Sequence, residues 1–330
     1  MAAAAQPALI GLDWGTSSLR GYLLSMDGSV LAAVTRPWGI QHLPAGGFPE
    51  AFTAVTGAWR SRDPALPVVA AGMVGSRQGW REVPYVECPA DAAAIAHGMV
   101  PFAAEVGLIR LVPGVIQRNP LPNVLRGEET QIMGALTGEP GLVDDSLIVL
   151  PGTHSKWVTI RSGRITSFDT YMTGELFAIL RDHSLLGRPA REAADDHADA
   201  ATKAAAFQRG IALALESGPA GVGSRLFTAR SLYLTGELRP EVTLDYLSGL
   251  IVGEEVRGAL AARRGESLPP LALIGDPGLC VKYHQALTAC GVADARLLGD
   301  SAAAGIQQIA LAAGLFPAGA CDRPAASGGG

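Results

Sequence analysis

Lysine is scarce in this 330-residue chain, which contains Lys156, Lys203 and Lys282 and no others. The formal net charge is −5, so there is no basic excess for a nucleic-acid groove or an acidic membrane surface. The uncharged run at 301–321 is interrupted by Gln307, Gln308 and Pro317 and so falls short of the ~18–20 apolar residues that a membrane-spanning helix needs, and the N-terminal segment lacks the basic start of a signal peptide. We therefore expect a cytoplasmic protein with neither nucleic-acid nor membrane partners.

Cysteine is also scarce, and several common motifs are missing. Cys88, Cys280, Cys290 and Cys321 lack the CxxC or Cys/His spacing of structural zinc sites and fit reduced thiols. The sequence has no G-x-x-x-x-G-K-[ST], which excludes a P-loop enzyme. It has no G-x-G-x-x-G after the first strand, so a Rossmann dinucleotide site is not supported.

Apolar residues, by contrast, make up 48% of the chain, and the length favours two domains over one. Strand-like runs alternate with Ala- and Leu-rich helical stretches, which is typical of an α/β fold. Strands are expected at 8–13, at 19–34 as a hairpin, and at 66–75, 146–152, 156–168, 231–236 and 271–276. Helices are expected at 48–61, 128–136, 174–181, 190–216, 243–264, 281–289 and 301–313.

Two segments repeat one pattern of strand, turn and returning hairpin. L-I-G-L-D-W-G-T-S-S precedes a hairpin that turns at Asp27-Gly28, and L-I-V-L-P-G-T-H-S precedes one that turns at Ser162-Gly163. Gly15-Thr16-Ser17-Ser18 thereby pairs with Gly152-Thr153-His154-Ser155. Glycine lets the backbone approach a ligand, and successive N–H groups with Thr and Ser hydroxyls form an anion-binding concavity.

For either turn alone, the simpler interpretation is a hairpin turn whose Ser and Thr side chains bond the local backbone. Both turns in the same setting favour a duplicated domain. We then expect the two loops to hold a polyphosphate from opposite walls of a cleft.

The segments that carry a family resemblance run in order along nearly the whole chain. They are IGLDWGTSSLRGYL (10–23), AGMVGSRQGWREVPYVECPA (71–90), LRGEETQIMGAL (125–136), LPGTHSKWVTI (150–160), DTYMTGELFAIL (169–180) and GDSAAAGIQQIA (299–310). This sequence resembles the 2-keto-3-deoxygalactonate kinases of the actin/hexokinase/Hsp70 ATPase superfamily. The resemblance implies two ribonuclease H-like domains, 1–145 and 146–330, with a nucleotide cleft between them. It also implies that the last helix packs back on the first domain.

The resemblance further implies transfer of phosphate from ATP, with Mg²⁺, to the C6 hydroxyl of 2-dehydro-3-deoxy-D-galactonate. Asp13 is expected to hold Mg²⁺, because this ion takes only one or two protein carboxylates. The alternative for Asp13 is a turn residue. The residues expected to bind ATP are Asp13, Gly15, Thr16, Ser17, Gly152, Thr153, His154, Ser155, Lys156, Gly275 and Asp276, the last two at the adenosine.

The resemblance implies that a catalytic base lies at the start of the helix after Gly127. Alignment on that glycine favours Glu128 and alignment on Thr130 favours Glu129, so both remain candidates, with Asp169 as a fallback. Acids in a first helical turn are also common without a catalytic role. The residues expected to bind the sugar acid are Ser76, Arg77, Gln78, Trp80 and Glu175.

Arginine binds carboxylates through two parallel hydrogen bonds, which suits Arg77 to a sugar acid. The alternative is an ordinary surface loop with a half-buried Trp80. Two other functions stay open: a kinase of another sugar or sugar acid on the same fold, and a non-catalytic ATP-binding sugar sensor. A homodimer is a further possibility.

Overall fold

The computed structural model describes residues 5–193, 198–263 and 267–316. Contacts within the chain divide it into two compact units. The first unit comprises Met1–Asp144, Ile160–Ser167 and Asp300–Gly330, and the second comprises Asp145–Thr159 and Phe168–Gly299. The first unit is therefore built from three segments of the chain, the last of which begins at Asp300 and contains the last described helix.

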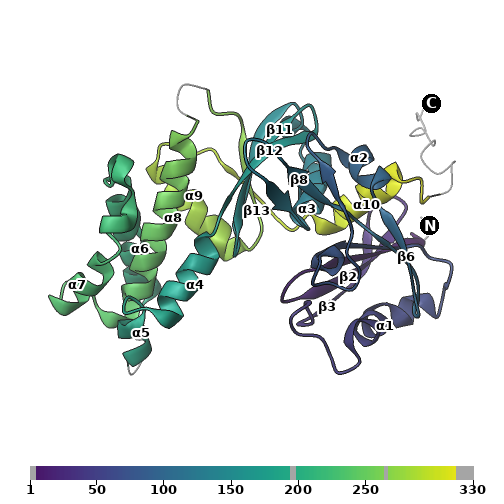
Figure 1. Ribbon diagram of the computed structural model, residues 1–330, viewed down its shortest axis with the longest axis horizontal. Helices are drawn as coiled ribbons and strands as arrows, with labels where there is room; N and C mark the ends of the chain where they lie inside the picture. Colours follow the sequence, from purple (N-terminus) through teal and green to yellow (C-terminus); the bar gives the residue numbers. More distant parts are fainter. Residues whose placement is uncertain (1–4, 194–197, 264–266, 317–330) are drawn as a thin grey trace, which may run out of the picture. The chain divides into compact units, whose positions relative to one another are not determined.

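The first unit contains a six-stranded sheet in the order β3-β2-β1-β4-β7-β6, of which β2, β3 and β6 are labelled in Figure 1. Its strands are β1 (Pro7–Trp14), β2 (Leu19–Ser25), β3 (Val30–Arg36), β4 (Val68–Gly72), β6 (Val100–Ala104) and β7 (Gly107–Leu111). β1 pairs antiparallel with β2 and parallel with β4. Every residue of β4 is buried, as expected for a continuous apolar run at the centre of a covered sheet. A smaller sheet joins β5 (Tyr85–Glu87), β8 (Gly114–Gln117) and β9 (Asn123–Leu125).

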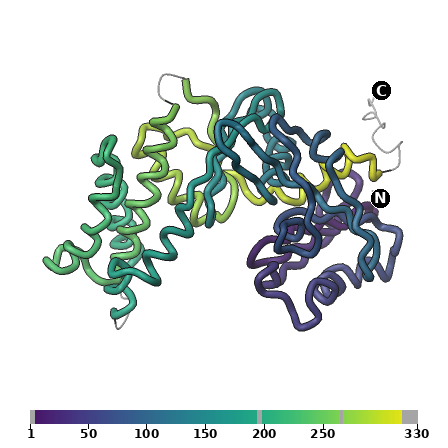
Figure 2. Tube along the Cα trace, in the orientation of Figure 1, coloured from purple at the N-terminus to yellow at the C-terminus, as the bar shows by residue number. Residues whose placement is uncertain are grey.

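The helices of the first unit are α1 (Gly47–Arg60), α2 (Ala92–His97), α3 (Glu128–Gly138) and α10 (Ala302–Ala312), with short 3₁₀ turns at Met73–Gly75 (η1) and Pro140–Leu142 (η2). α10 packs on α3, and the yellow trace in Figure 2 lies among the N-terminal elements accordingly. A Cβ at Gly305 would lie 1.8 Å from the Thr130 carbonyl oxygen, and one at Gly134 would lie 2.0 Å from the Ser301 carbonyl oxygen. The two helix backbones therefore touch, which only glycine permits.

The second unit repeats this topology with the strand order β12-β11-β10-β13-β14. Its strands are β10 (Asp145–Leu150), β11 (Ser155–Arg161), β12 (Arg164–Tyr171), β13 (Leu271–Ile274) and β14 (Arg296–Leu298). The order matches β3-β2-β1-β4-β7 strand for strand, with parallel pairing of β10 to β13 as of β1 to β4. The predicted duplication is confirmed: both units have the ribonuclease H-like sheet of the actin-like ATPases.

The helices of the second unit are α4 (Thr173–His183), α5 (Arg188–Glu192), α6 (Ala200–Leu215), α7 (Thr228–Leu234), α8 (Thr243–Ala261) and α9 (Pro277–Ala289), with 3₁₀ turns η3 (Gly218–Ala220), η4 (Val222–Ser224) and η5 (Pro240–Val242). Figure 1 shows α6 and α8 side by side. A Cβ at Gly249 would lie 2.1 Å from the Phe207 carbonyl oxygen, which accounts for their close approach. α8 is buried along most of its length and forms the core of this unit with the sheet.

Two sequence-based predictions of elements were wrong. Residues 231–236, S-L-Y-L-T-G, were predicted as a strand but fall in and just after helix α7. A short apolar run does not distinguish the two structures, and here Ala229 packs into the core while the Thr228 hydroxyl bonds the Tyr246 hydroxyl of α8 at 2.7 Å. The single helix predicted at 190–216 is divided, since α5 ends at Glu192 and α6 begins at Ala200; positions 194–197 lie outside the described residues. Within the described ranges, no helix is long and apolar enough to cross a membrane.

Candidate active site

Asp13 lies near the carboxyl end of β1, where three segments of the first unit converge. Gly72 ends β4 with φ = +94°, and a Cβ there would lie 2.8 Å from the Trp14 carbonyl oxygen. Gly127 precedes α3 with φ = +109°, and a Cβ there would lie 3.3 Å from the Gly72 Cα. Positive φ and close approach both require glycine. The two glycines therefore seat the start of α3 against the ends of β1 and β4.

Charged groups surround Asp13. Arg20 Nη1 lies 3.7 Å from Asp13 Oδ2 and 3.2 Å from Asp300 Oδ2. The Tyr22 hydroxyl donates to Asp300 Oδ2 at 3.0 Å. Burial is the main cause that raises the pKa of Asp13 to about 6; Arg20 opposes the rise, and the charges of Asp300 and Glu128 add to it. A partly buried carboxylate beside two others favours the arrival of further positive charge.

These surroundings fit Mg²⁺ through one carboxylate. This ion retains several waters and is usually held by one or two carboxylates together with substrate phosphates. Across residues 5–193, 198–263 and 267–316, no group of three or more His, Cys, Asp and Glu side chains could hold a metal ion. Asp13, whose side chain is 22% exposed, and the exposed hydroxyls of the turn that follows it supply oxygen donors of the kind that Mg²⁺ accepts.

The two candidate catalytic glutamates have different surroundings. Glu129 is fully buried; its Oε2 accepts the Gly127 N–H at 2.7 Å and its Oε1 accepts the Thr130 hydroxyl at 3.0 Å. Burial, followed by the charge of Glu128, raises the pKa of Glu129 to about 7. Glu128 is half-buried, and its charge acts on Asp13. Of the two, Glu128 has the carboxylate that a ligand beside Asp13 could approach.

The first predicted phosphate loop is a tight turn directly after β1. The Gly15 N–H donates to the Ser18 carbonyl at 2.9 Å. A Cβ at Gly39 would lie 2.1 Å from the Thr16 carbonyl oxygen, so a second backbone segment lies against the turn. The side chains of Thr16 and Ser17 are exposed. The segment at Gly39 thus supports the backbone of the turn, while the turn's hydroxyls are exposed to solvent.

The second predicted loop exposes only its first residues. A Cβ at Gly152 would meet no atom of the described residues within 4 Å, and Thr153 and His154 are exposed. Ser155 is fully buried. Lys156 is 6% exposed, and its ammonium group donates to the Thr170 hydroxyl at 2.9 Å, so its amine lies within the sheet.

Helix α4 begins directly on this second loop. The Glu175 N–H donates to the Thr153 carbonyl at 3.0 Å, and Glu175 Oε2 lies 2.5 Å from His154 Nε2. A Cβ at Gly174 would lie 2.4 Å from the Gly152 carbonyl oxygen. Glu175, predicted to bind the sugar acid, is therefore a neighbour of the second loop within the second unit.

Two predicted acidic residues of the second unit already have partners. Asp276 caps α9, since its Oδ1 accepts the Leu279 N–H at 2.9 Å. The preceding Gly275 has φ = +140° and directly follows β13. Asp169, the fallback base, is exposed and forms an ion pair with Arg263 at 3.1 Å.

The predicted substrate loop contains both exposed and buried members. Arg77 and Gln78 are exposed, whereas Ser76 is 8% exposed and its Oγ has no hydrogen-bond partner among the described residues. Trp80 stacks on Phe48 with ring centroids 5.5 Å apart. Its other ring contacts are with Trp14, Phe52 and Phe102. The half-buried Trp80 therefore belongs to an aromatic cluster of the first-unit core.

Three polar residues near these segments were missed. Arg20 and Asp300 belong to the Asp13 cluster. Arg126 lies 4.2 Å over the Tyr85 ring and donates through Nη2 to the Val83 carbonyl at 2.8 Å, while its Nε and Nη1 are buried without a partner in the described structure. The sequence offered a signal for two of them, because each is a charged residue beside apolar ones. Arg20 lies within an apolar strand, and Asp300 directly precedes a helical segment that contains no charged residue.

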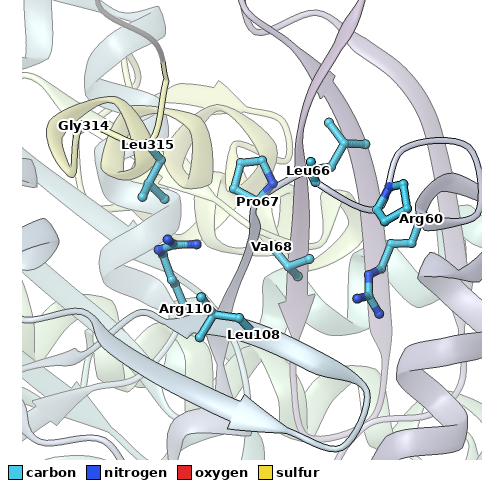
Figure 3. A pocket seen from close by; sticks show the side chains of 10 residues that line it. Arg60, Leu66, Pro67, Val68, Leu108, Arg110, Gly314 and Leu315 are labelled. Atoms are coloured by element: carbon cyan, nitrogen blue, oxygen red, sulfur yellow. The ribbon is translucent and has the colours of Figure 1, made fainter.

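A pocket of about 410 Å³ lies at the other edge of the first-unit sheet (Figure 3). It is lined at the start of β4 by Leu66, Pro67 and Val68 and on β7 by Leu108 and Arg110. Ligands of open α/β sheets bind at the carboxyl ends of the parallel strands. Asp13 is at that edge, so this pocket is separate from the candidate active site.

The repeated ribonuclease H-like sheet, the strand-end carboxylate of Asp13 and the exposed hydroxyl turn after it fit a nucleotide-binding kinase with two such units. The chain belongs to the 2-keto-3-deoxy-galactonokinase family, whose sequence model matches residues 13–309.

Individual relatives agree with this family. The chain is 37% identical over 284 residues to the Rhizobium meliloti (strain 1021) protein named as the probable 2-dehydro-3-deoxygalactonokinase DgoK1, covering 85% of this chain and 89% of the relative. It is 36% identical over 310 residues to the 2-dehydro-3-deoxygalactonokinase of Escherichia coli (strain K12), covering 92% and 97%. A crystal structure from Sinorhizobium meliloti, described under the same enzyme name, superposes with a TM-score of 0.81 at 35% identity and covers 92% of this chain and 98% of its own.

Proposed function

We propose that this enzyme is an ATP-dependent kinase of 2-dehydro-3-deoxy-D-galactonate that phosphorylates the C6 hydroxyl. Family membership supports the reaction class and the substrate. The observation that carries the site assignment is the half-buried Glu128 at the start of α3, whose charge acts on Asp13 while Glu129 is buried. The cytoplasm is the proposed compartment, because it supplies ATP, and a homodimer stays a proposal.

In the proposed reaction Glu128 orients the C6 hydroxyl and accepts its proton. The C6 oxygen forms a bond to the γ-phosphorus as the bond from that phosphorus to the β,γ-bridging oxygen breaks, and ADP leaves. Phosphoryl transfer depends mainly on the position of the reacting groups and on stabilisation of the developing charge. One well-placed carboxylate and fixed hydrogen-bond donors to the phosphates are therefore sufficient. Asp13 would hold Mg²⁺, which would neutralise phosphate charge, and a carboxylate bound to the metal is not free to accept the hydroxyl proton.

The turn Gly15–Ser17 supports phosphate binding through its exposed hydroxyls and fixed backbone, and Gly152–His154 supports it in the second unit. Ser155 and Lys156 are buried, so we assign them a supporting role. For the sugar-acid carboxylate we propose Arg77, which is exposed and whose planar fork suits a carboxylate.

A coupled ADP-release assay with purified Glu128→Gln and Glu129→Gln tests the assignment. General-base catalysis contributes about 10²–10⁴-fold, so we expect Glu128→Gln to lower kcat by at least about 100-fold. Glu129→Gln is the matched control and should retain kcat within about 10-fold, because its amide keeps an acceptor for the Gly127 N–H. Equal losses of kcat in the two variants would refute the assignment of Glu128 as the catalytic base. Equal turnover of glucose and the sugar acid by the wild type would refute the substrate.

A further inference from the structure

A closed set of hydrogen bonds lies beneath the second loop, entirely within the second unit. Glu255 of α8 is 3% exposed. Its Oε1 accepts the Trp157 indole N–H at 2.7 Å, and its Oε2 accepts the Tyr283 hydroxyl at 2.5 Å. The Tyr283 oxygen lies 2.6 Å from the Ser155 hydroxyl. Because the Tyr283 proton goes to Glu255, Ser155 is the donor in that last bond.

The same carboxylate also holds the start of α4. The hydroxyl of Thr173, the first residue of α4, interacts with the Glu255 carboxylate and with the Tyr283 hydroxyl. α4 in turn packs on the loop, where a Cβ at Gly174 would meet the Gly152 carbonyl oxygen at 2.4 Å. Glu255 thus ties down both segments that form the second loop, through Tyr283 and Ser155 on one side and through Thr173 on the other.

Burying a carboxylate costs free energy even when neutral groups donate hydrogen bonds to it. Glu255 must therefore provide something that an apolar residue in its place could not. Apolar packing is ample here, since Tyr283, Trp157 and Val256 belong to one buried cluster. What the polar groups add is direction, because hydrogen bonds fix the loop backbone at Ser155 and at Thr173 in a way that dispersion contacts do not.

We infer that Glu255 and Tyr283 are positioning residues that hold the Gly152–Ser155 loop in the conformation that binds the ATP phosphates. This rests on the proposed function for the identity of the ligand. Neither residue touches the nucleotide in this proposal: Ser155, buried and already donating to Tyr283, transmits the constraint. Thr153 and His154 are the exposed residues of the loop that face the ligand.

The test compares Tyr283→Phe with Tyr246→Phe. Both tyrosines are buried in the second unit, and each has its hydroxyl bonded to another hydroxyl, at 2.6 Å for Tyr283 and at 2.7 Å for Tyr246. Tyr246 bonds Thr228 of α7, so its variant loses an equivalent hydrogen bond without touching the loop. Thermal unfolding of both variants measures the structural cost that they share.

The readout is Kd for ATP·Mg²⁺ and for AMP by titration calorimetry, alongside KM for ATP and for the sugar acid. Tyr283→Phe removes the hydroxyl's bonds to both Glu255 and Ser155, and loss of the one that reaches the loop, at Ser155, corresponds to about 3- to 10-fold in affinity. We expect Tyr283→Phe to raise Kd for ATP·Mg²⁺ by that factor. Kd for AMP and KM for the sugar acid should stay within about 2-fold of the wild type. Tyr246→Phe should leave all four values within about 2-fold. Glu255→Gln should resemble Tyr283→Phe in weakening the binding of ATP and not that of AMP.

An equal loss for ATP and AMP, or no loss in Tyr283→Phe beyond that of Tyr246→Phe, would overturn the inference and leave the network with a purely structural role. The calorimetric arm needs no sugar acid. If the wild type binds ATP but does not phosphorylate the sugar acid, the proposed substrate fails while the positioning role is still measured.

Discussion

Replacing Glu129 by Gln should change how the stability of the first unit depends on pH. Burial raises the pKa of the Glu129 carboxyl from 4.5 to about 7 in the folded protein. Between these two values the folded chain keeps a proton that the unfolded chain has lost, so the free energy of unfolding falls as pH rises. The contribution is favourable below pH 4.5 and is fully lost above about pH 7.

The difference between 4.5 and about 7 corresponds, at about 1.36 kcal/mol per pKa unit, to about 3 kcal/mol. Glu129→Gln cannot ionise, and its amide can accept the Gly127 N–H and donate to the Thr130 hydroxyl. Relative to the wild type, the variant should therefore gain up to about 3 kcal/mol between pH 5 and pH 8. Rearrangement of the charges near Glu129 on unfolding reduces this difference in the free energy of unfolding.

The assay is urea unfolding of the nucleotide-free protein at pH 5 and pH 8, followed by tryptophan fluorescence. Trp14, Trp38, Trp59 and Trp80 lie in the first unit and only Trp157 lies in the second, so the signal reports mainly on the unit that contains Glu129. Glu82→Gln, which replaces an exposed glutamate of the same unit, is the control. If the stability difference between Glu129→Gln and the wild type is the same at both pH values, the buried carboxyl does not titrate as argued.

Two further predictions concern the same unit. Asp13→Asn should lower Mg²⁺-dependent kcat by at least about 100-fold with the melting temperature retained; unchanged turnover over a magnesium titration would remove Asp13 from metal binding. Gly134→Ala should destabilise the protein by about 2 kcal/mol or more in urea unfolding, because the new Cβ would lie 2.0 Å from the Ser301 carbonyl oxygen. Gly138→Ala in the same helix meets no described atom within 4 Å and should cost nothing. Equal effects of the two alanines would refute the close packing of α3 on α10.

Much of the fold could be predicted because its signals are local. The buried run of β1, the Gly turns of the hairpins and the paired G-T-x-S loops each depend on a few adjacent residues, and the strand order of the two units agrees with the duplication. The prediction of a strand at residues 231–236 failed for the opposite reason. Their apolar pattern is short, and contacts of α7 with α8 decide the structure.

The surroundings of the site residues were less predictable, because they depend on partners far apart in the sequence. Arg20 meets Asp300 across 280 positions, and Ser155 meets Tyr283 across 128. Trp80 was assigned to the sugar on its place in the loop, and its contacts with an aromatic cluster arise from α1 and β6. Sequence spacing could name Glu128 and Glu129 as a pair, but burial separates them.

The duplicated loops differ at the position of the proposed metal ligand. Aligned on Gly15 and Gly152, the position of Asp13 in the first unit is occupied by Leu150 in the second, which is 4% exposed. The second loop therefore has no strand-end carboxylate, and its fourth residue, Ser155, is buried where Ser18 is half-buried. A Leu150→Asp variant would place an unpaired carboxylate in an apolar strand, where desolvation opposes its ionisation. The asymmetry follows from burial: at the aligned position the first unit has a partly exposed carboxylate and the second a buried leucine, so in the proposed site the second loop would contact phosphate through its backbone, Thr153 and His154 and would not bind the metal.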